Sequence, residues 1–425
     1  MRFLSLITCV VGNEVYFDQI LDHFSSNVST TFQQRYYVND VYYEKGGPAF
    51  IYIGGESAFN EKRLMDGMMA DLAQEHRGVI YGLEHRYYGK SHPFPELSVA
   101  NLKYLSSDQA LEDLVYFASK ESPHHPSKWF LIGGSYGGTL AAWGRQKYPR
   151  VFHGALASSA PVLAKADFYE FDEMVAKSLG NECHSSVNKL IAYLDDVYEQ
   201  GDLGSIKKMF NCTKIQDDIL FLSMAADVIA NIVLHESQFP LGINEVCSQL
   251  NSVDSEKERL TIFLDIFSFV LERFGRSGHE FTYFDEIKSQ IPTEHTYFRQ
   301  WIYQACQEFG FWQTASKLPM RSKYLTFDWF NSFYCGSTFF NPAIGPPNTD
   351  LTNSKNKGKE LNASNIMFTH GEKDPWSALS YTKGNSIIIS NGSHCNDMYP
   401  EIYNSYSFSE TKVRIKDTFR AWIGP

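Results

Sequence analysis

Apolar runs and helical periodicity alternate along the first part of the chain. The apolar runs predict buried strands at 48–53, 78–83, 129–132 and 154–158. Between them, 61–75 and 107–119 carry apolar residues at helical spacing, and Ser107 is the predicted cap of the second helix. Strands that alternate with helices predict a parallel sheet covered by helices on both faces.

The N-terminal stretch has a different pattern. Residues 14–43 are rich in aromatic side chains that alternate with polar ones. Period-two alternation of this kind is typical of strands with one buried face. We therefore expect an antiparallel hairpin here, with its turn at Asn39 and Asp40.

The pattern changes again after Ala164. Between 164 and 338 strand patterns are absent, and apolar residues recur at helical spacing in 189–198, 217–234 and 256–274. This predicts a helical insertion. Residues 341–363 are polar and rich in turn formers, which indicates a surface loop. The sheet pattern then resumes with strands predicted at 365–369 and 386–389 and a closing helix at 411–422.

A nucleophile motif lies between the strand at 129–132 and the next helix, which we expect to begin at Thr139. The sequence there is Gly133-Gly134-Ser135-Tyr136-Gly137-Gly138, a G-x-S-x-G elbow. A serine hydroxyl needs a sharp turn that exposes it to a histidine base, and the flanking residues must be small. Ser135 is therefore the candidate nucleophile, and the N–H of Tyr136 can point at a developing oxyanion.

The acid and the base are expected after the insertion, on loops that follow strands. Asp374 and Glu372 both qualify as the acid, and we choose Asp374 because Pro375 and Trp376 would fix its backbone and shield it. A helix N-cap is the alternative role for an Asp before Pro. His394 follows the last strand and is preferred as the base to His370, which precedes the acid. The second oxyanion donor is predicted to be the N–H of Gly55, after the strand that ends at 53.

This order of serine, acid and histidine around a helical insertion predicts an α/β-hydrolase fold. We expect the first part of the hydrolase domain at 13–163, a helical cap domain at 164–340, and the second part at 341–425. The N-terminal residues 1–12 are apolar after Arg2 and predict a signal peptide.

Composition narrows the function further. The net charge of −11 argues against nucleic-acid binding, and no segment is apolar enough to span a bilayer. Outside the predicted signal the chain has an even number of cysteines, which suits an oxidising compartment. N-x-S/T sequons, which are acceptor sites for glycosylation, occur at Asn27, Asn211, Asn362 and Asn391. The sequence has no H-E-x-x-H, paired C-x-x-C or Walker-type motif, so we expect neither a metal nor a cofactor.

The chain resembles the lysosomal Pro-Xaa carboxypeptidase family of serine peptidases, and its thymus-specific serine protease branch most closely. The matching segments are FDQILDHF (17–24), GGPAFIYIGGES (46–57), EHRYYGKSHPF (84–94), YLSSDQALEDL (104–114), GGSYGGTLAAW (133–143), YQACQEFGFWQT (303–314), GEKDPW (371–376) and GSHCNDM (392–398). The resemblance implies a secreted or endo-lysosomal peptidase that cleaves after proline near a chain end. Its motifs assign the same triad, Ser135, Asp374 and His394.

The resemblance also implies substrate contacts and disulfides. Trp376 corresponds to an aromatic wall of the proline pocket, and Thr139 stands at the pocket floor where a relative has methionine, which makes that floor smaller or more polar. The implied disulfides are Cys183–Cys247 and Cys306–Cys335, whereas the pairing of Cys212 and Cys395 is left open.

The direction of cleavage is not assigned by the sequence. Glu56 is a candidate anchor for a substrate ammonium, and a structural hydrogen-bond acceptor is an equal alternative. The expected partners are proline-containing peptides, and a homodimer is one option for the assembly. The competing functions are a carboxylesterase or lipase on the same fold and an inactive hydrolase-fold binding protein.

Overall fold

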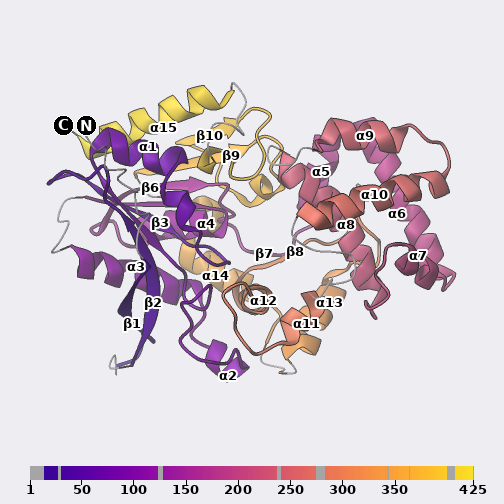
Figure 1. Cartoon of the computed structure of the whole chain (residues 1–425), viewed down its shortest axis with the longest axis horizontal. Helices are drawn as coiled ribbons and strands as arrows, with labels where there is room; N and C mark the ends of the chain where they lie inside the picture. The colour runs from indigo at the N-terminus through magenta and orange to yellow at the C-terminus, as the bar shows by residue number, and fades with distance from the viewer. Residues whose placement is uncertain are drawn as a thin grey trace, which may run out of the picture.

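An eight-stranded sheet forms the centre of the structure (Figure 1). The computed structural model describes residues 14–26, 30–122, 128–236, 241–273, 283–339, 341, 344–362, 364–399 and 407–424, so the predicted signal peptide and Asn27 lie outside it. The strand order is β1-β2-β4-β3-β5-β6-β9-β10. The strands are β1 (Val15–Ile20), β2 (Thr31–Asn39), β3 (Ala49–Ile53), β4 (Val79–Leu83), β5 (Trp129–Gly134), β6 (Phe152–Ser158), β9 (Ile366–Gly371) and β10 (Ser386–Ile389).

The sheet is parallel except at β2, which pairs antiparallel with both β1 and β4. From β4 to β10 each neighbouring pair is parallel. The carboxyl ends of these strands therefore meet at one edge, and loops that follow them lie close together. This topology, with helices on both faces, is that of the α/β-hydrolase fold.

Alternate residues of the central strands pack against different helix layers, as the period of a strand requires. In β5, Phe130 and Ile132 belong to the core that contains α1 (Gly67–His76) and α15 (Ser407–Ile423). Leu131 belongs to the other core, which contains α3 (Ser107–Glu121) and α4 (Tyr136–Lys147). Both faces of β5 are thus buried, which explains its continuous apolar run.

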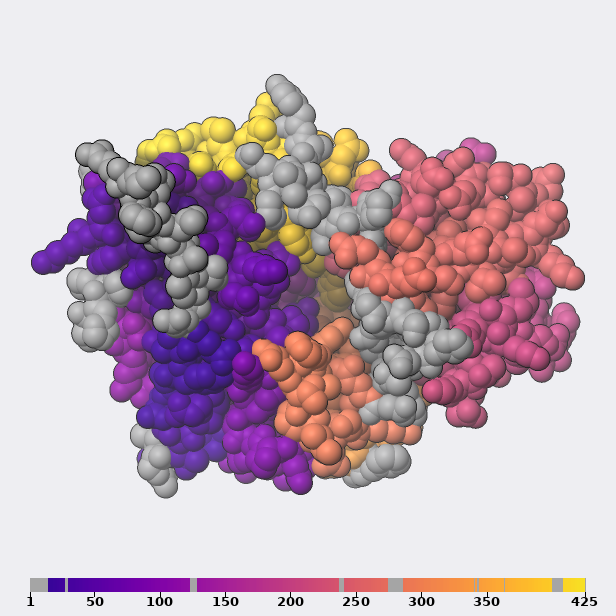
Figure 2. Space-filling view, in the orientation of Figure 1, coloured from indigo at the N-terminus to yellow at the C-terminus, as the bar shows by residue number. Residues whose placement is uncertain are grey.

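Helices fill the chain between β6 and β9 and form a lobe beside the sheet (Figures 1 and 2). In the lobe lie α5 (Glu170–Leu179), α6 (Asn181–Glu199), α7 (Leu203–Met209), α8 (Asp218–Leu234), α9 (Ile243–Asn251) and α10 (Glu256–Arg273). Shorter elements follow, namely α11 (Tyr283–Lys288), α12 (Phe298–Gln304), the π-helix η4 (Ala305–Phe309), α13 (Phe327–Phe330) and the π-helix η5 (Asn331–Ser337). Within the described part of the chain, every helix is too short or too polar to cross a membrane.

Two disulfides hold the helical region together. Cys183–Cys247 joins α6 to α9, and Cys306–Cys335 joins η4 to η5. Both pairings are those that the family resemblance implied. Cys212 and Cys395 are buried free thiols in this structure.

Several predicted elements are wrong in detail. The hairpin is formed by β1 and β2, and residues 40–48 contain no strand. Val41, which continued the alternating pattern, is 62% exposed and lies outside the described strands. The helix predicted at 61–75 is divided into η1 (Glu61–Leu64) and α1.

Tertiary contacts explain three further corrections. Ser106 rather than Ser107 caps α3, because the Ser107 hydroxyl donates a 2.6 Å hydrogen bond to Glu308. The polar segment 341–363 contains the helices α14 (Thr349–Asn356) and η6 (Gly358–Glu360). The region expected to lack strands contains β7 (Lys165–Asp167) and β8 (Gly310–Trp312), which pair with each other. These two strands are too short to produce a pattern.

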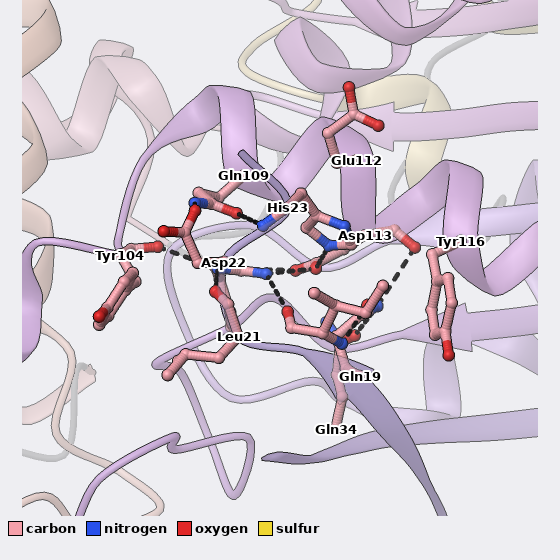
Figure 3. A network of polar contacts seen from close by, with 12 residues as sticks. Gln19, Leu21, Asp22, His23, Gln34, Tyr104, Gln109, Glu112, Asp113 and Tyr116 are labelled. Atoms are coloured by element: carbon pink, nitrogen blue, oxygen red, sulfur yellow. Dashed lines mark hydrogen bonds and ion pairs between the residues drawn. The ribbon is translucent and has the colours of Figure 1, made fainter. Parts of the chain in front are cut away.

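A buried polar network joins three of the family-like segments away from the serine (Figure 3). Arg86 forms an ion pair with Asp113 of α3 and donates to the carbonyl oxygens of Ile20 and Leu21. His23 contacts the same carboxylate at 2.8 Å. The segments 17–24, 84–94 and 104–114 therefore meet in a structural network.

Candidate active site

Ser135 occupies a strained turn between β5 and α4. Its backbone angles are φ 55° and ψ −127°, outside the regions that a side chain favours. The turn is closed tightly, because a Cβ atom on Gly133 would lie 2.2 Å from the Gly137 carbonyl oxygen. Glycine is therefore required at Gly133. The helix begins at Tyr136, three residues before the predicted start, so the turn is sharper than expected.

His394 and Asp374 form a hydrogen-bonded pair. The Nδ1 atom of His394 lies 3.0 Å from both carboxylate oxygens of Asp374. Asp374 is fully buried, and its Oδ1 also accepts a 3.0 Å hydrogen bond from the N–H of Trp376. Asp374 thus caps η7 (Pro375–Leu379) as well as contacting the histidine.

The pair is electrostatically coupled. Burial opposes the charge of Asp374, but the imidazole of His394 and its hydrogen bond outweigh burial and lower the pKa of the carboxyl. Burial likewise disfavours the protonated imidazole of His394. The attraction of the Asp374 carboxylate is stronger than this effect of burial, so the pKa of His394 is raised well above its usual value.

The loop that carries His394 is fixed on both sides. The N–H of His394 donates to the Leu234 carbonyl of α8 at 3.0 Å. The next N–H, from Cys395, donates to the Ser159 hydroxyl at 2.8 Å. Both Cys395 and Ser159 have positive φ, at 55° and 47°. The loop that carries the histidine is therefore held by α8 and by the residue after β6.

A cavity of about 370 Å³ lies beside the serine. It is lined by Tyr52, Ile53, Gly54, Gly55, Glu56, Ser57, Ala58, Phe59, Asn60, Arg63, Gly134, Ser135, His235, His394, Cys395, Met398 and Tyr399. The structure thus places Ser135, His394, Gly55 and Glu56 around one cavity. Burial raises the pKa of the Glu56 carboxyl, which favours its neutral form.

The predicted oxyanion residues lie next to each other at the start of α4. A Cβ atom on Gly55 would be 3.7 Å from the amide nitrogen of Gly137. Tyr136 is the first residue of the helix, where N–H groups have no partner within the helix. Its ring is buried, and its hydroxyl accepts a 2.9 Å hydrogen bond from Gln304.

Trp376 belongs to an aromatic cluster that borders the site. Its ring contacts Phe168, Phe171 and Phe311, with centroid distances of 5.2–5.7 Å. Its centroid lies 6.5 Å from that of His394. Thr139 is buried, and its hydroxyl donates to the Pro161 carbonyl at 3.1 Å. Neither Trp376 nor Thr139 lines the 370 Å³ cavity.

The rejected alternatives lie elsewhere. His370 is buried in β9, where its Nε2 contacts the Tyr381 carbonyl at 2.7 Å. Glu372 is exposed, and its carboxylate accepts from the N–H of Asn391. Neither residue lines the cavity.

Sequence reasoning missed several residues of the cavity. Arg63, His235 and Tyr399 each line it, and each comes from a different part of the chain. Burial lowers the pKa of His235 to about 4, so this imidazole is neutral near neutral pH. No local motif marks these residues. Cys395 and Met398 could have been suspected from their proximity to His394 in the sequence.

Comparisons with known proteins give matches over most of the chain. The family model described as serine carboxypeptidase S28 matches residues 19–414. A Caenorhabditis elegans protein named as a serine protease is 32% identical over 96% of this chain and 87% of its own length. Human thymus-specific serine protease is 30% identical, covering 91% of this chain and 82% of its own. Bovine lysosomal Pro-X carboxypeptidase is 29% identical, with 90% and 82% covered.

Proposed function

Because the chain belongs to the serine carboxypeptidase S28 family, we propose that it is a serine exopeptidase that hydrolyses bonds on the carboxyl side of proline near a chain end. The family makes it a serine peptidase that acts on peptides. The observation that carries the proposal is the Asp374–His394 hydrogen bond beside a strained Ser135. Strained residues of this kind are concentrated at functional sites.

In the proposed mechanism, the Ser135 hydroxyl attacks the carbonyl carbon of the scissile bond. Nε2 of His394 takes the serine proton and then gives it to the leaving amine. Asp374 holds the Nδ1–H of the imidazole and stabilises its positive charge. The N–H groups of Tyr136 and Gly55 stabilise the oxyanion. Water then hydrolyses the acyl-enzyme by the same proton transfers.

The aromatic cluster around Trp376 supports a proline preference. A proline ring is uncharged and flat, and aromatic faces recognise it by shape and apolar contact. Trp376 lies close to both Phe311 and His394, so a ring packed on it would place the following bond near the base. The Thr139 hydroxyl donates to the Pro161 carbonyl, so it is already engaged and is not available to a substrate.

The proposal includes a secreted or endo-lysosomal location. Two disulfides require an oxidising compartment, and one relative is named as a lysosomal enzyme.

The test uses purified protein, its Ser135→Ala variant and two peptides. One peptide has a free amino terminus with proline second, and the other is amino-blocked with proline next to last. Mass spectrometry identifies the bond that breaks. We expect cleavage after proline by the wild-type protein and none by Ser135→Ala. Hydrolysis of simple esters without cleavage of either peptide would refute the proposal and indicate an esterase.

A further inference from the structure

The 370 Å³ cavity and the aromatic cluster around Trp376 are two surfaces that meet at His394. His394 lines the cavity, and its ring also lies 6.5 Å from that of Trp376. When proline packs on the aromatic cluster, the cavity is left for the residue on the other side of the scissile bond. That residue leaves with the proton that His394 delivers.

Arg63 gives this cavity a permanent positive charge. Arginine stays protonated in proteins. Burial opposes the charge here, but Tyr52 and Tyr399 more than offset it, and the pKa of Arg63 lies above its usual value. Among the described residues, no carboxylate lies within 4.0 Å of Arg63, whereas the buried Arg86 and Arg321 each pair with an aspartate.

The guanidinium is positioned by its surroundings. It lies over the ring of Tyr399, 4.4 Å from the centroid. Its helix η1 is capped by Asn60, whose side chain accepts from the N–H of Lys62, and is anchored by the buried Leu64. An arginine stacked on an aromatic face loses little freedom when it binds a carboxylate, and its planar donors match both oxygens.

The other charged candidates in the cavity do not compete for this role. Among the residues that the structure describes, no cation lies within 4.0 Å of the Glu56 carboxylate. Burial raises the pKa of this carboxyl, so Glu56 is a weak anchor for an ammonium group at acidic pH. His235 is neutral near neutral pH, because burial lowers its pKa to about 4. The electrostatics of the cavity therefore suit an anionic group better than a cationic one.

We propose that Arg63 binds the α-carboxylate of the residue that leaves, which makes the enzyme a carboxypeptidase. This inference rests on the proposed function and adds to it the direction of cleavage and the residue that sets it. The carboxylate of the last residue would sit on the Arg63 guanidinium, with the scissile bond between Ser135 and His394. A peptide that continues past this residue has a neutral amide in place of the α-carboxylate, so it presents no negative charge to Arg63.

The test compares three amino-blocked substrates with the same proline. The first ends in a free carboxylate one residue after proline, the second is its carboxamide, and the third is a proline anilide without a further residue. The wild-type enzyme is expected to prefer the acid to the amide by at least about 30-fold in kcat/KM. Arg63→Gln should remove this preference and leave anilide hydrolysis within about 3-fold of wild type.

Two further variants serve as controls. Arg63→Lys keeps the charge without the planar donors and should retain part of the preference. Lys62→Gln removes an exposed charge from the same helix and should behave as wild type. Labelling of Ser135 by a fluorophosphonate reports that each variant is folded.

The possible outcomes separate the two proposals. An equal loss on all three substrates in Arg63→Gln would show a structural role and overturn the carboxylate assignment. Cleavage of only the free-amine peptide, abolished by Glu56→Gln, would also overturn it while keeping the proposed function. If no proline substrate is cleaved although Ser135 is labelled, the proposed function fails, and the role of Arg63 fails with it.

Discussion

The backbone N–H of His394 donates a 3.0 Å hydrogen bond to the carbonyl oxygen of Leu234, the last residue of α8. Carbonyls at the end of a helix lack partners within the helix, so this one is free to accept. A second contact involves the neighbouring residues: Lys373, next to Asp374, forms a 2.6 Å ion pair with Glu236, which follows α8. The helical lobe therefore contacts both loops of the candidate acid–base pair.

Breaking the Lys373–Glu236 pair should loosen the loop of Asp374. Its side chains are 25% and 19% exposed, so we expect a coupling of roughly 1 kcal/mol or less. Glu236→Gln should lower kcat/KM about 5-fold at most. Added salt screens the ion pair, so it should also lower the kcat/KM of the wild-type enzyme. A double-mutant cycle with Lys373→Gln measures the coupling. The exposed pair Lys323–Glu199 is the control and should show none. Equal couplings in both pairs would contradict this interpretation.

The rate at low pH should be limited by protonation of His394. Asp374 raises the pKa of this imidazole, and a protonated imidazole cannot accept the serine proton. Labelling of Ser135 by a fluorophosphonate should therefore rise with pH through a value above about 6.5, the usual pKa of histidine. Asp374→Asn should move this limb to lower pH and slow labelling by about 10⁴-fold. Glu372→Gln is the control and should leave the profile unchanged. An unshifted limb in Asp374→Asn would exclude this coupling.

The Arg86–Asp113 pair should be required for stability and not for chemistry. Both side chains are at most 2% exposed, and removing one partner leaves a buried charge. Asp113→Asn should lower the free energy of unfolding by about 3–5 kcal/mol, measured by urea denaturation. The control Glu44→Gln, from an exposed pair with Arg77, should have little effect.

The same pair predicts a pH dependence of stability. Burial opposes the charge of Asp113, but Arg86 outweighs it and lowers the pKa of the carboxyl. The stabilisation is therefore present above the unfolded pKa of about 3.9 and is lost as the pH falls through the lower folded value. A stability of Asp113→Asn equal to wild type at pH 6 would refute the role of this pair.

Glu308 should make the fold more stable at mildly acidic pH than at neutral pH. Burial raises the pKa of its carboxyl to about 7, despite hydrogen bonds from Ser107. The folded state then binds a proton more tightly than the unfolded chain, whose glutamates have a pKa of about 4.3. Stability should fall as the pH rises from about 4.3 to 7, by up to ~3 kcal/mol.

Glu308→Gln tests this prediction because it keeps an acceptor for Ser107 and cannot ionise. Urea midpoints at pH 5 and pH 7 should differ less in this variant than in the wild type. Glu360→Gln removes an exposed carboxylate, 82% exposed, and should keep the wild-type difference. An unchanged difference in Glu308→Gln would assign the pH effect to other groups.

The sequence was sufficient to predict those features of the fold and the candidate site that depend on neighbouring residues in the chain. The glycines around Ser135 are needed for its turn, because a Cβ atom on Gly133 would clash with the backbone of Gly137. The apolar run of β5 has to be buried on both faces. Asp374 and His394 could be chosen because parallel strands end at a common edge, where the loops that follow them meet.

Prediction failed where a distant segment supplies the partner. Ser107 looks like a helix cap, but Glu308 engages its hydroxyl, so Ser106 takes the role. The polar helix α14 looks like a loop, but the Thr352 hydroxyl and the Asn353 amide bind the carbonyls of Glu308 and Ala164. Such contacts join residues far apart in the chain and leave no local pattern.

The sequence by itself determined the hydrolase fold, the strained turn of Ser135 and the identity of the acid–base candidates, because periodicity and backbone sterics act within a few residues. Only the tertiary structure placed Arg63, His235 and Tyr399 around one cavity with Ser135, and only it brought Leu234 to the backbone of His394. The charge that a substrate meets in this cavity depends on which distant segments pack together. That packing is driven by burial of apolar surface along the whole chain, so no short stretch of sequence reveals it.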